Sequence, residues 1–101
     1  MLVYNITIKI HPEINTEWVQ WQKQEHIPDV MSSSLFTDYK FYRLLETEET
    51  GGVTYVVQFF VASDANYKKY IQEFAGKLRQ KAFDRWGDKF IAFRTIMQVV
   101  N

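Results

Sequence analysis

The chain has 101 residues, with twelve basic and twelve acidic side chains and no cysteine. This length suits one domain over residues 1–101. The lack of cysteine excludes disulfides, thiolate catalysis and zinc fingers, and zero net charge gives no general attraction to nucleic acid or an anionic membrane. The apolar runs are too short to span a bilayer, and the first residues lack a basic segment with a cleavage site, so we expect a cytoplasmic protein.

The first expected element is a strand over residues 2–10, in which apolar and polar side chains alternate. Its even positions are apolar, which predicts one buried face. His11 and Pro12 end this strand, because proline cannot donate a hydrogen bond to a neighbouring strand.

A helix is expected next, with Asn15 or Thr16 as its N-cap. Trp18 and Trp21 fall on one side of it and predict an apolar stripe. Pro28 is expected to stop or bend this helix, with one more helical turn and a loop behind it.

Two strands follow, over residues 35–45 and 53–61. The charged segment 46–52 ends in two glycines, which indicates a hairpin turn. Ser63 is suited to cap a long second helix, in which Gly76 is a possible kink and Gly87 a C-cap.

The last expected element is a strand over residues 89–100. The order βαββαβ predicts a ferredoxin-like α+β plait, in which a four-stranded antiparallel sheet carries both helices on one face.

The other face of this sheet is expected to be partly apolar. In the last strand we assign Ile91, Phe93 and Met97 to the helix side, and Phe90, Arg94 and Ile96 to the open side. The strand over 35–45 has no clear alternation, so its faces stay open. Large apolar side chains on an exposed sheet face indicate that another molecule covers them. A second copy of the chain, packed sheet to sheet, is the simplest such partner. The two sheets would enclose a small-molecule cavity.

Four segments carry a family resemblance. They are the opening strand with Tyr4, Asn5, Thr7 and Lys9, then Glu25 to Pro28, Leu35 to Tyr39, and Lys89 to Thr95. With them the chain resembles the dimeric α/β-barrel superfamily and, more narrowly, a family of short bacterial proteins classed as a domain of unknown function. The superfamily includes cofactor-free monooxygenases, muconolactone isomerases and haem-degrading enzymes. The resemblance implies the plait and a homodimer, and the narrower family carries no assigned activity.

His26 and Arg94 are the first candidates for chemistry. His26 titrates near neutral pH and could transfer protons, or it could simply stabilise the end of its helix. Arg94, if inside a barrel, must be paired. Its partner would be the carboxylate or enolate oxygen of a substrate, or an acidic residue such as Asp38 across the dimer.

Polar and aromatic residues supply further candidates. Asn5, Gln58 and Phe60 are expected to line the barrel interior with Arg94, and Tyr39 is a weaker catalytic candidate. This type of cavity resembles that of cofactor-free barrel monooxygenases, in which polar groups orient an electron-rich substrate.

Other functions are disfavoured. Two histidines without ligand spacing do not predict a metal site. The second helix lacks the histidine that barrel haem-degraders use, and the strand over 53–61 lacks the basic and glycine residues of an RNA-recognition sheet. We therefore expect no cofactor, no nucleic acid and no membrane partner.

The sequence favours a cytoplasmic homodimer that binds a small, partly aromatic or anionic molecule inside the barrel. A cofactor-independent monooxygenase or isomerase is the first alternative, and a structural dimer with a filled interior is the second. Whether any reaction is catalysed stays open.

Overall fold

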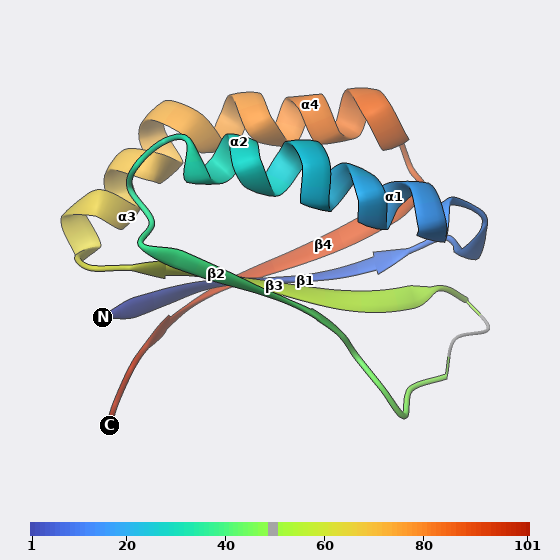
Figure 1. Cartoon of the computed structure of the whole chain (residues 1–101), viewed down its shortest axis with the longest axis horizontal. Coiled ribbons are helices and arrows are strands. Elements are labelled where there is room, and N and C mark those ends of the chain that lie inside the picture. Colours follow the sequence, from blue (N-terminus) through green and yellow to red (C-terminus); the bar gives the residue numbers. More distant parts are fainter. Residues whose placement is uncertain (49–50) are drawn as a thin grey trace.

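The structure is a computed structural model that describes residues 1–48 and 51–101. Two helical segments and a four-stranded sheet follow the predicted order (Figure 1). The elements are β1 (Leu2–Ile10), α1 (Asn15–Trp21), α2 (Ile27–Met31), β2 (Asp38–Arg43), β3 (Val53–Val61), α3 (Asp64–Tyr70), α4 (Gly76–Trp86) and β4 (Phe90–Gln98). No helix in the described part of the chain is long and apolar enough to cross a membrane.

A π-helical turn joins α1 to α2 over Gln22–His26, so the two form one continuous helical segment. In this wider turn the backbone N–H of Ile27 donates to the carbonyl of Gln22. Pro28 lies in the first turn of α2 and does not end the helix, so of the two predicted outcomes the stop is wrong. The further helical turn and the loop predicted behind Pro28 are present. Proline is tolerated at this position because it needs no backbone donor there.

The start of the first helix also differs from the prediction. A short 3₁₀ turn over Pro12–Ile14 precedes it, and His11 caps that turn by accepting a 3.2 Å hydrogen bond from the N–H of Glu13. Ile14 is the N-cap of α1, without a side-chain bond. Asn15 instead accepts a 2.5 Å hydrogen bond from the hydroxyl of Tyr55, which ties the helix to the sheet.

The second helical segment begins and ends as predicted. The hydroxyl of Ser63 accepts a 3.1 Å hydrogen bond from the N–H of Asn66. Gly87 follows the last helical residue with φ of 60°, a backbone region that favours glycine. A second π-helical turn over Ile71–Ala75 lies directly before Gly76.

The sheet is antiparallel with strand order β2-β3-β1-β4, and both helical segments cover the same face of it (Figure 1). The predicted plait is confirmed. β2 is shorter than the predicted strand over 35–45 because it pairs only from Asp38 to Arg43. The predicted turn over 46–52 includes residues 49 and 50, which lie outside the described residues.

The register divides the side chains between the two faces, since directly paired residues share a face. Tyr55, Val57 and Phe59 of β3 lie opposite even-numbered residues of β1 and are buried beneath the helices. Trp18 packs against Tyr55 with ring centroids 5.2 Å apart. The sequence did not decide which residues of β2 face the helices. The register shows that Tyr39 and Phe41 do.

The predicted faces of β4 are reversed. Arg94 pairs with Ile6, which lies on the helix side, so Arg94, Phe90 and Ile96 share that side. Ile91, Phe93 and Met97 therefore lie on the open face. Both sets contain large apolar residues, so hydrophobicity did not separate them. An edge strand tolerates arginine on its helix side, because the side chain still reaches solvent.

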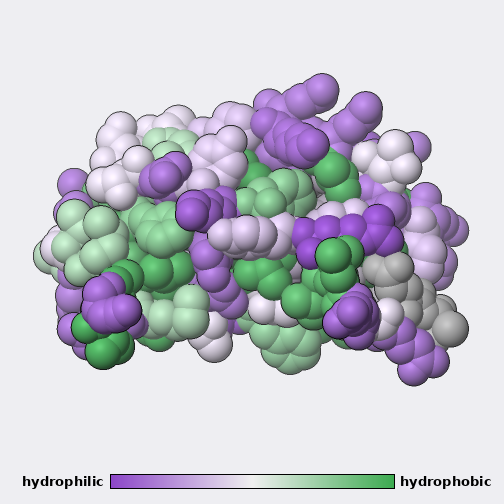
Figure 2. Space-filling model, turned by 60° about the horizontal axis from the view of Figure 1, so that its bottom comes forward, coloured by the Kyte–Doolittle hydropathy of each residue, from purple (hydrophilic) through white to green (hydrophobic). Residues whose placement is uncertain are grey.

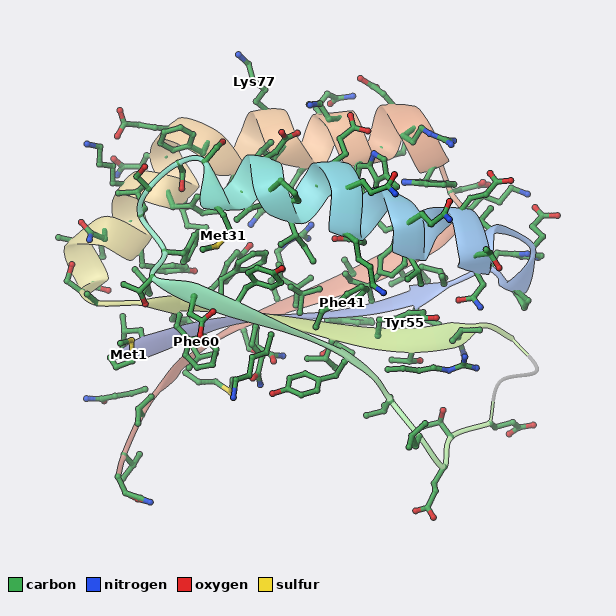
Figure 3. The ribbon with its side chains drawn as sticks, in the orientation of Figure 1. Met1, Met31, Phe41, Tyr55, Phe60 and Lys77 are labelled. Atoms are coloured by element: carbon green, nitrogen blue, oxygen red, sulfur yellow. The ribbon has the colours of Figure 1, made fainter. Side chains whose placement is uncertain are left out.

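The open face is the lower surface of the sheet in Figure 1, and Figure 2 shows apolar side chains gathered there between hydrophilic ones. Phe93 and Ile91 are 65% and 59% exposed. Val3 pairs with both Phe60 and Met97 and lies between them, and Phe60 lies below the sheet (Figure 3). The chain after β2 and the C-terminal segment both extend below this face.

Candidate functional site

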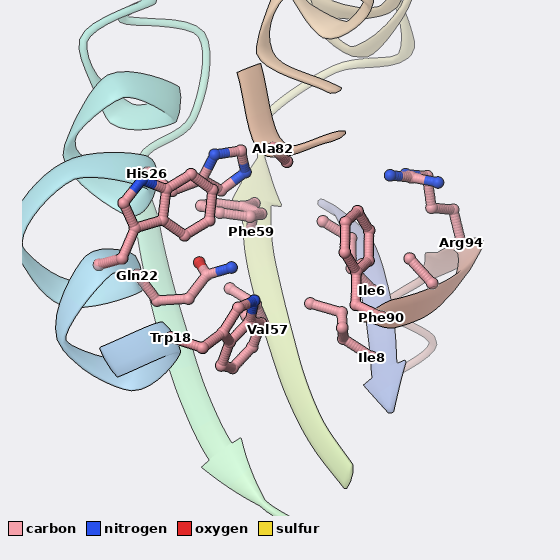
Figure 4. Close-up of a pocket in the computed structure, with 12 residues that line it drawn as sticks. Ile6, Ile8, Trp18, Gln22, His26, Val57, Phe59, Ala82, Phe90 and Arg94 are labelled. Atoms are coloured by element: carbon pink, nitrogen blue, oxygen red, sulfur yellow. The ribbon is translucent and has the colours of Figure 1, made fainter. Parts of the chain in front are cut away.

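A small cavity lies between the helical layer and the sheet (Figure 4). It has a volume of about 40 Å³. Most of its wall is apolar and comes from α1, β1, β3, α4 and β4. Three polar side chains face it, namely Gln22, His26 and Arg94. The first two stand at the ends of the π-helical turn, which brings both to the same side of the helix.

Gln22 is the most deeply buried of the three, at 3% exposure. Its amide points into the cavity (Figure 4), and its Oε1 accepts no hydrogen bond from any residue that the structure describes. A buried acceptor without a donor costs about 1–3 kcal/mol. The cavity therefore presents an acceptor that an N–H or O–H group of a bound molecule would satisfy.

His26 stacks on Trp21, with ring centroids 4.7 Å apart and ring planes at 24°. The pKa of His26 is lowered to about 4, chiefly by burial; the charge of Asp29 opposes this shift, and the nearby Lys81 and Arg94 add to it. His26 is therefore neutral around pH 7 and offers a flat, uncharged wall that can still donate or accept one hydrogen bond.

Arg94 reaches the cavity from β4, across from His26 (Figure 4). It is exposed to solvent on its other side. Within residues 1–48 and 51–101, no side chain forms an ion pair or hydrogen bond with it, and no acidic side chain lines the cavity. An unpaired guanidinium at the mouth of an apolar cavity is suited to hold a carboxylate in a two-pronged hydrogen bond.

The sequence-predicted site residues thus fall into three places. His26 and Arg94 meet at the cavity. Tyr39 is 43% exposed and lines a separate surface groove with Lys23 and Lys40. The expectation that Arg94 lies inside a barrel with Asn5 and the other polar residues is wrong, because the β4 register turns it to the helix side.

The remaining predicted residues lie together on the open face. Asn5 and Gln58 are directly paired, and the amide nitrogen of Gln58 donates to Oδ1 of Asn5 at 3.3 Å. The amide nitrogen of Asn5 in turn lies 3.4 Å from the hydroxyl of Thr7. Phe60 is partly buried beside them. Their part in ligand binding stays a prediction.

Gln22 was not among the sequence candidates. The sequence could have indicated Gln22, because it lies four residues after Trp18 and so falls on the apolar stripe of the helix. A polar residue there is buried and needs a hydrogen-bond partner.

The described residues contain no group of three or more histidine or acidic side chains that could hold a metal ion.

The sequence matches one family model, described as "Domain of unknown function (DUF4286)", over residues 1–100. A comparison with curated proteins gives no match.

Several solved structures share the fold. An ethyl tert-butyl ether d (EthD) family protein from Bacillus halodurans has 14% identity and a TM-score of 0.69, with 99% of this chain and 100% of that chain covered. A putative antibiotic biosynthesis monooxygenase from Bordetella bronchiseptica has 16% identity and a TM-score of 0.71, covering 99% and 98%. A dimeric ferredoxin-like protein from an uncultured marine organism has 10% identity and a TM-score of 0.69, covering 99% and 96%. At these identities the likeness concerns the fold alone.

Proposed function

The chain belongs to the DUF4286 family, within a group of dimeric α/β-barrel folds, and we propose that it binds a small organic acid in the cavity between its helices and its sheet. The observation that carries this proposal is the buried Oε1 of Gln22, to which no residue that the structure describes donates. The ligand's carboxylate would lie against Arg94. A hydroxyl or N–H group next to it would donate to Gln22.

The chemistry of the cavity supports binding of an acid. Arg94 supplies a positive charge that no described side chain neutralises, and the apolar walls exclude water from the bound group. The volume of about 40 Å³ is enough for roughly three water molecules. Only a carboxylate with its first substituent would enter, and the rest of a larger molecule would lie in the mouth beside Arg94.

The state of His26 favours binding over proton transfer. A general base works best when its pKa is near the working pH, whereas burial holds the pKa of His26 at about 4. We therefore propose a neutral contact for His26, with the ligand's apolar part against its ring. The cofactor-independent oxygenase or isomerase expected as an alternative would need a different base.

The experiment is a titration followed by NMR, comparing lactate with propionate, which lacks only the hydroxyl. We expect lactate to bind about tenfold more tightly, since one buried hydrogen bond contributes about 1 kcal/mol or slightly more. Gln22→Leu should remove this preference, and Arg94→Gln should weaken both acids. Lys77→Gln is the matched control, because Lys77 points away from the sheet into solvent (Figure 3). Equal binding of both acids by the unaltered protein would refute the role of Gln22.

We also propose that two copies pack through their open sheet faces. Apolar residues on β4 support this, because Phe93 and Ile91 stay largely exposed in one copy. Three strands of nine residues, about 30 Å long, and the six-residue β2, about 20 Å long, give a face of roughly 530 Å² in flat projection. A stable interface needs about 800 Å² per partner, and this face supplies a large share of that area. The segments below the face, with Leu45 and Val100 exposed, would extend the contact.

A second copy of the chain suits the open face because that face carries both polar and apolar residues. The hydrogen-bonded pair of Asn5 and Gln58 lies in the middle of the sheet. The apolar residues of β4 lie along one edge, with Tyr42 on β2 at the opposite edge. In a two-fold dimer this face meets the same face of the second copy, so the polar pair at the centre can meet its equivalent and the apolar edges, β4 and β2, can meet apolar edges.

A further inference from the structure

A second small cavity adjoins the first under the same helices. It has a volume of about 30 Å³ and shares four of its lining residues with the first cavity: Ile6, His26, Ala82 and Arg94. We call the two cavities the first and second lobe. The second lobe extends toward α3 and α4 and is lined in addition by Tyr4, Tyr70 and Arg79.

Arg79 is the distinctive group of the second lobe. Its Nη2 donates a 2.9 Å hydrogen bond to the hydroxyl of Tyr4, which is 3% exposed. This bond directs the guanidinium toward the lobe and leaves its other N–H groups free to donate. Burial raises the pKa of the Tyr70 hydroxyl, so this neighbour stays protonated and neutral.

No carboxylate lines either lobe among the described residues. Asp29, whose charge acts on His26, does not line either lobe and is paired with Lys81 at 2.8 Å. Glu25 is 4.0 Å from the same lysine. The two lobes together therefore present two guanidinium groups, Arg79 and Arg94, with neither in an ion pair to a described residue.

We propose that the two lobes bind a short dicarboxylic acid, with one carboxylate at Arg94 and the second at Arg79. This proposal rests on the proposed function and names the substrate class of the same site. Each lobe has room for roughly two or three water molecules, which is about the size of one carboxylate group. Ile6 and Ala82 line both lobes and are apolar, which suits contact with a methylene spacer.

Charge also favours two carboxylates over one. A monoanion pairs with one guanidinium and leaves the other, which is exposed to solvent on its far side, without an anionic partner in the site. A dianion pairs both, and each pair is strengthened because the surrounding helices keep part of the site dry. Inorganic phosphate is compact and would occupy a single lobe, so it makes a useful contrast.

The test compares succinate with butyrate, which have the same chain length and differ by one carboxylate. Calorimetric titration of the full chain should show succinate binding roughly tenfold more tightly. Arg79→Gln should reduce succinate to the level of butyrate and leave butyrate unchanged. Arg79→Lys, which keeps the charge, should retain part of the preference, and Lys77→Gln should change neither acid.

The outcomes separate this inference from the proposed function. Equal binding of succinate and butyrate, or a succinate affinity that Arg79→Gln does not alter, would overturn the two-lobed site while lactate binding at Arg94 still stands. Phosphate binding more tightly than succinate would also overturn it. If lactate, butyrate and succinate all fail to bind, the proposed function itself is wrong.

Discussion

Phe93 is the residue whose substitution tests the open-face dimer most sharply. The side chain is 65% exposed, which leaves about 130 Å² of the roughly 200 Å² of a phenylalanine in contact with water. At about 25 cal/mol per Å², covering this area stabilises the dimer by up to about 3 kcal/mol for each copy. A dimer contains two copies, so Phe93→Ser removes up to about 6 kcal/mol and raises the dissociation constant by up to about four orders of magnitude.

Sedimentation velocity over a series of concentrations measures this change. We expect the unaltered chain to sediment as a dimer at micromolar concentration and the Phe93→Ser variant as a monomer. Phe83→Ser is the matched control, because Phe83 is 59% exposed on α4, in the helical layer away from the open face. Identical behaviour of the two variants, or a monomeric unaltered chain, would refute the reasoning.

Three further predictions concern stability. The pKa of His26 lies at about 4 in the folded chain and at about 6.5 in the unfolded chain. Below pH 6.5 the unfolded chain therefore binds a proton that the folded chain does not, and the free energy of unfolding falls by about 3 kcal/mol as the pH drops toward 4. The free energy of urea unfolding, measured against pH, should show that His26→Asn lacks this part of the acid destabilisation and that His11→Asn keeps it. Parallel pH curves for the unaltered chain and both variants would contradict the burial of His26. Trp18→Ala should lower the unfolding free energy by about 3–5 kcal/mol, because its side chain is almost fully buried, and a loss below 1 kcal/mol would count against the core described. Ser63→Ala should cost about 1 kcal/mol through the lost N-cap, whereas Ser34→Ala, in a loop without such a cap, serves as its control.

The sequence predicted the architecture because most elements carry a local signal. The alternation of β1 and β3 gave their buried faces correctly, and Ser63 and Gly87 marked the ends of the second helical segment. The prediction for Pro28 failed because the destabilisation that proline causes depends on its position within a helix. The π-helical turn precedes Pro28, and Pro28 then lies in the first turn of α2, where proline is tolerated.

β4 shows where sequence patterns fail. Its two faces are nearly equal in apolar content, since it is an edge strand that meets the helices on one side and free surface on the other. Only the pairing of Arg94 with Ile6 decides its orientation. That pairing is a long-range property, and a shift of one residue would reverse every side chain.

The candidate site was predictable only in part. His26 and Arg94 stand out as polar residues among apolar neighbours, and both reach the first lobe. Their meeting depends on the register of β4 and on the π-helical turn. Gln22 and Arg79 become visible once the helices are placed on the sheet. Gln22 stands out because it is buried with an acceptor that no described residue satisfies, and Arg79 because its hydrogen bond to Tyr4 places it at the second lobe.

The central claim is that the ligand lies between the helices and the sheet, and side-chain NMR of the glutamine amides tests it directly. Gln22 faces the first lobe and Gln58 lies on the open face, so each reports one location. On titration with lactate, we expect the amide signals of Gln22 to shift in proportion to saturation and those of Gln58 to stay unchanged. Shifts at Gln58 with none at Gln22 would place the ligand on the open face and contradict the account.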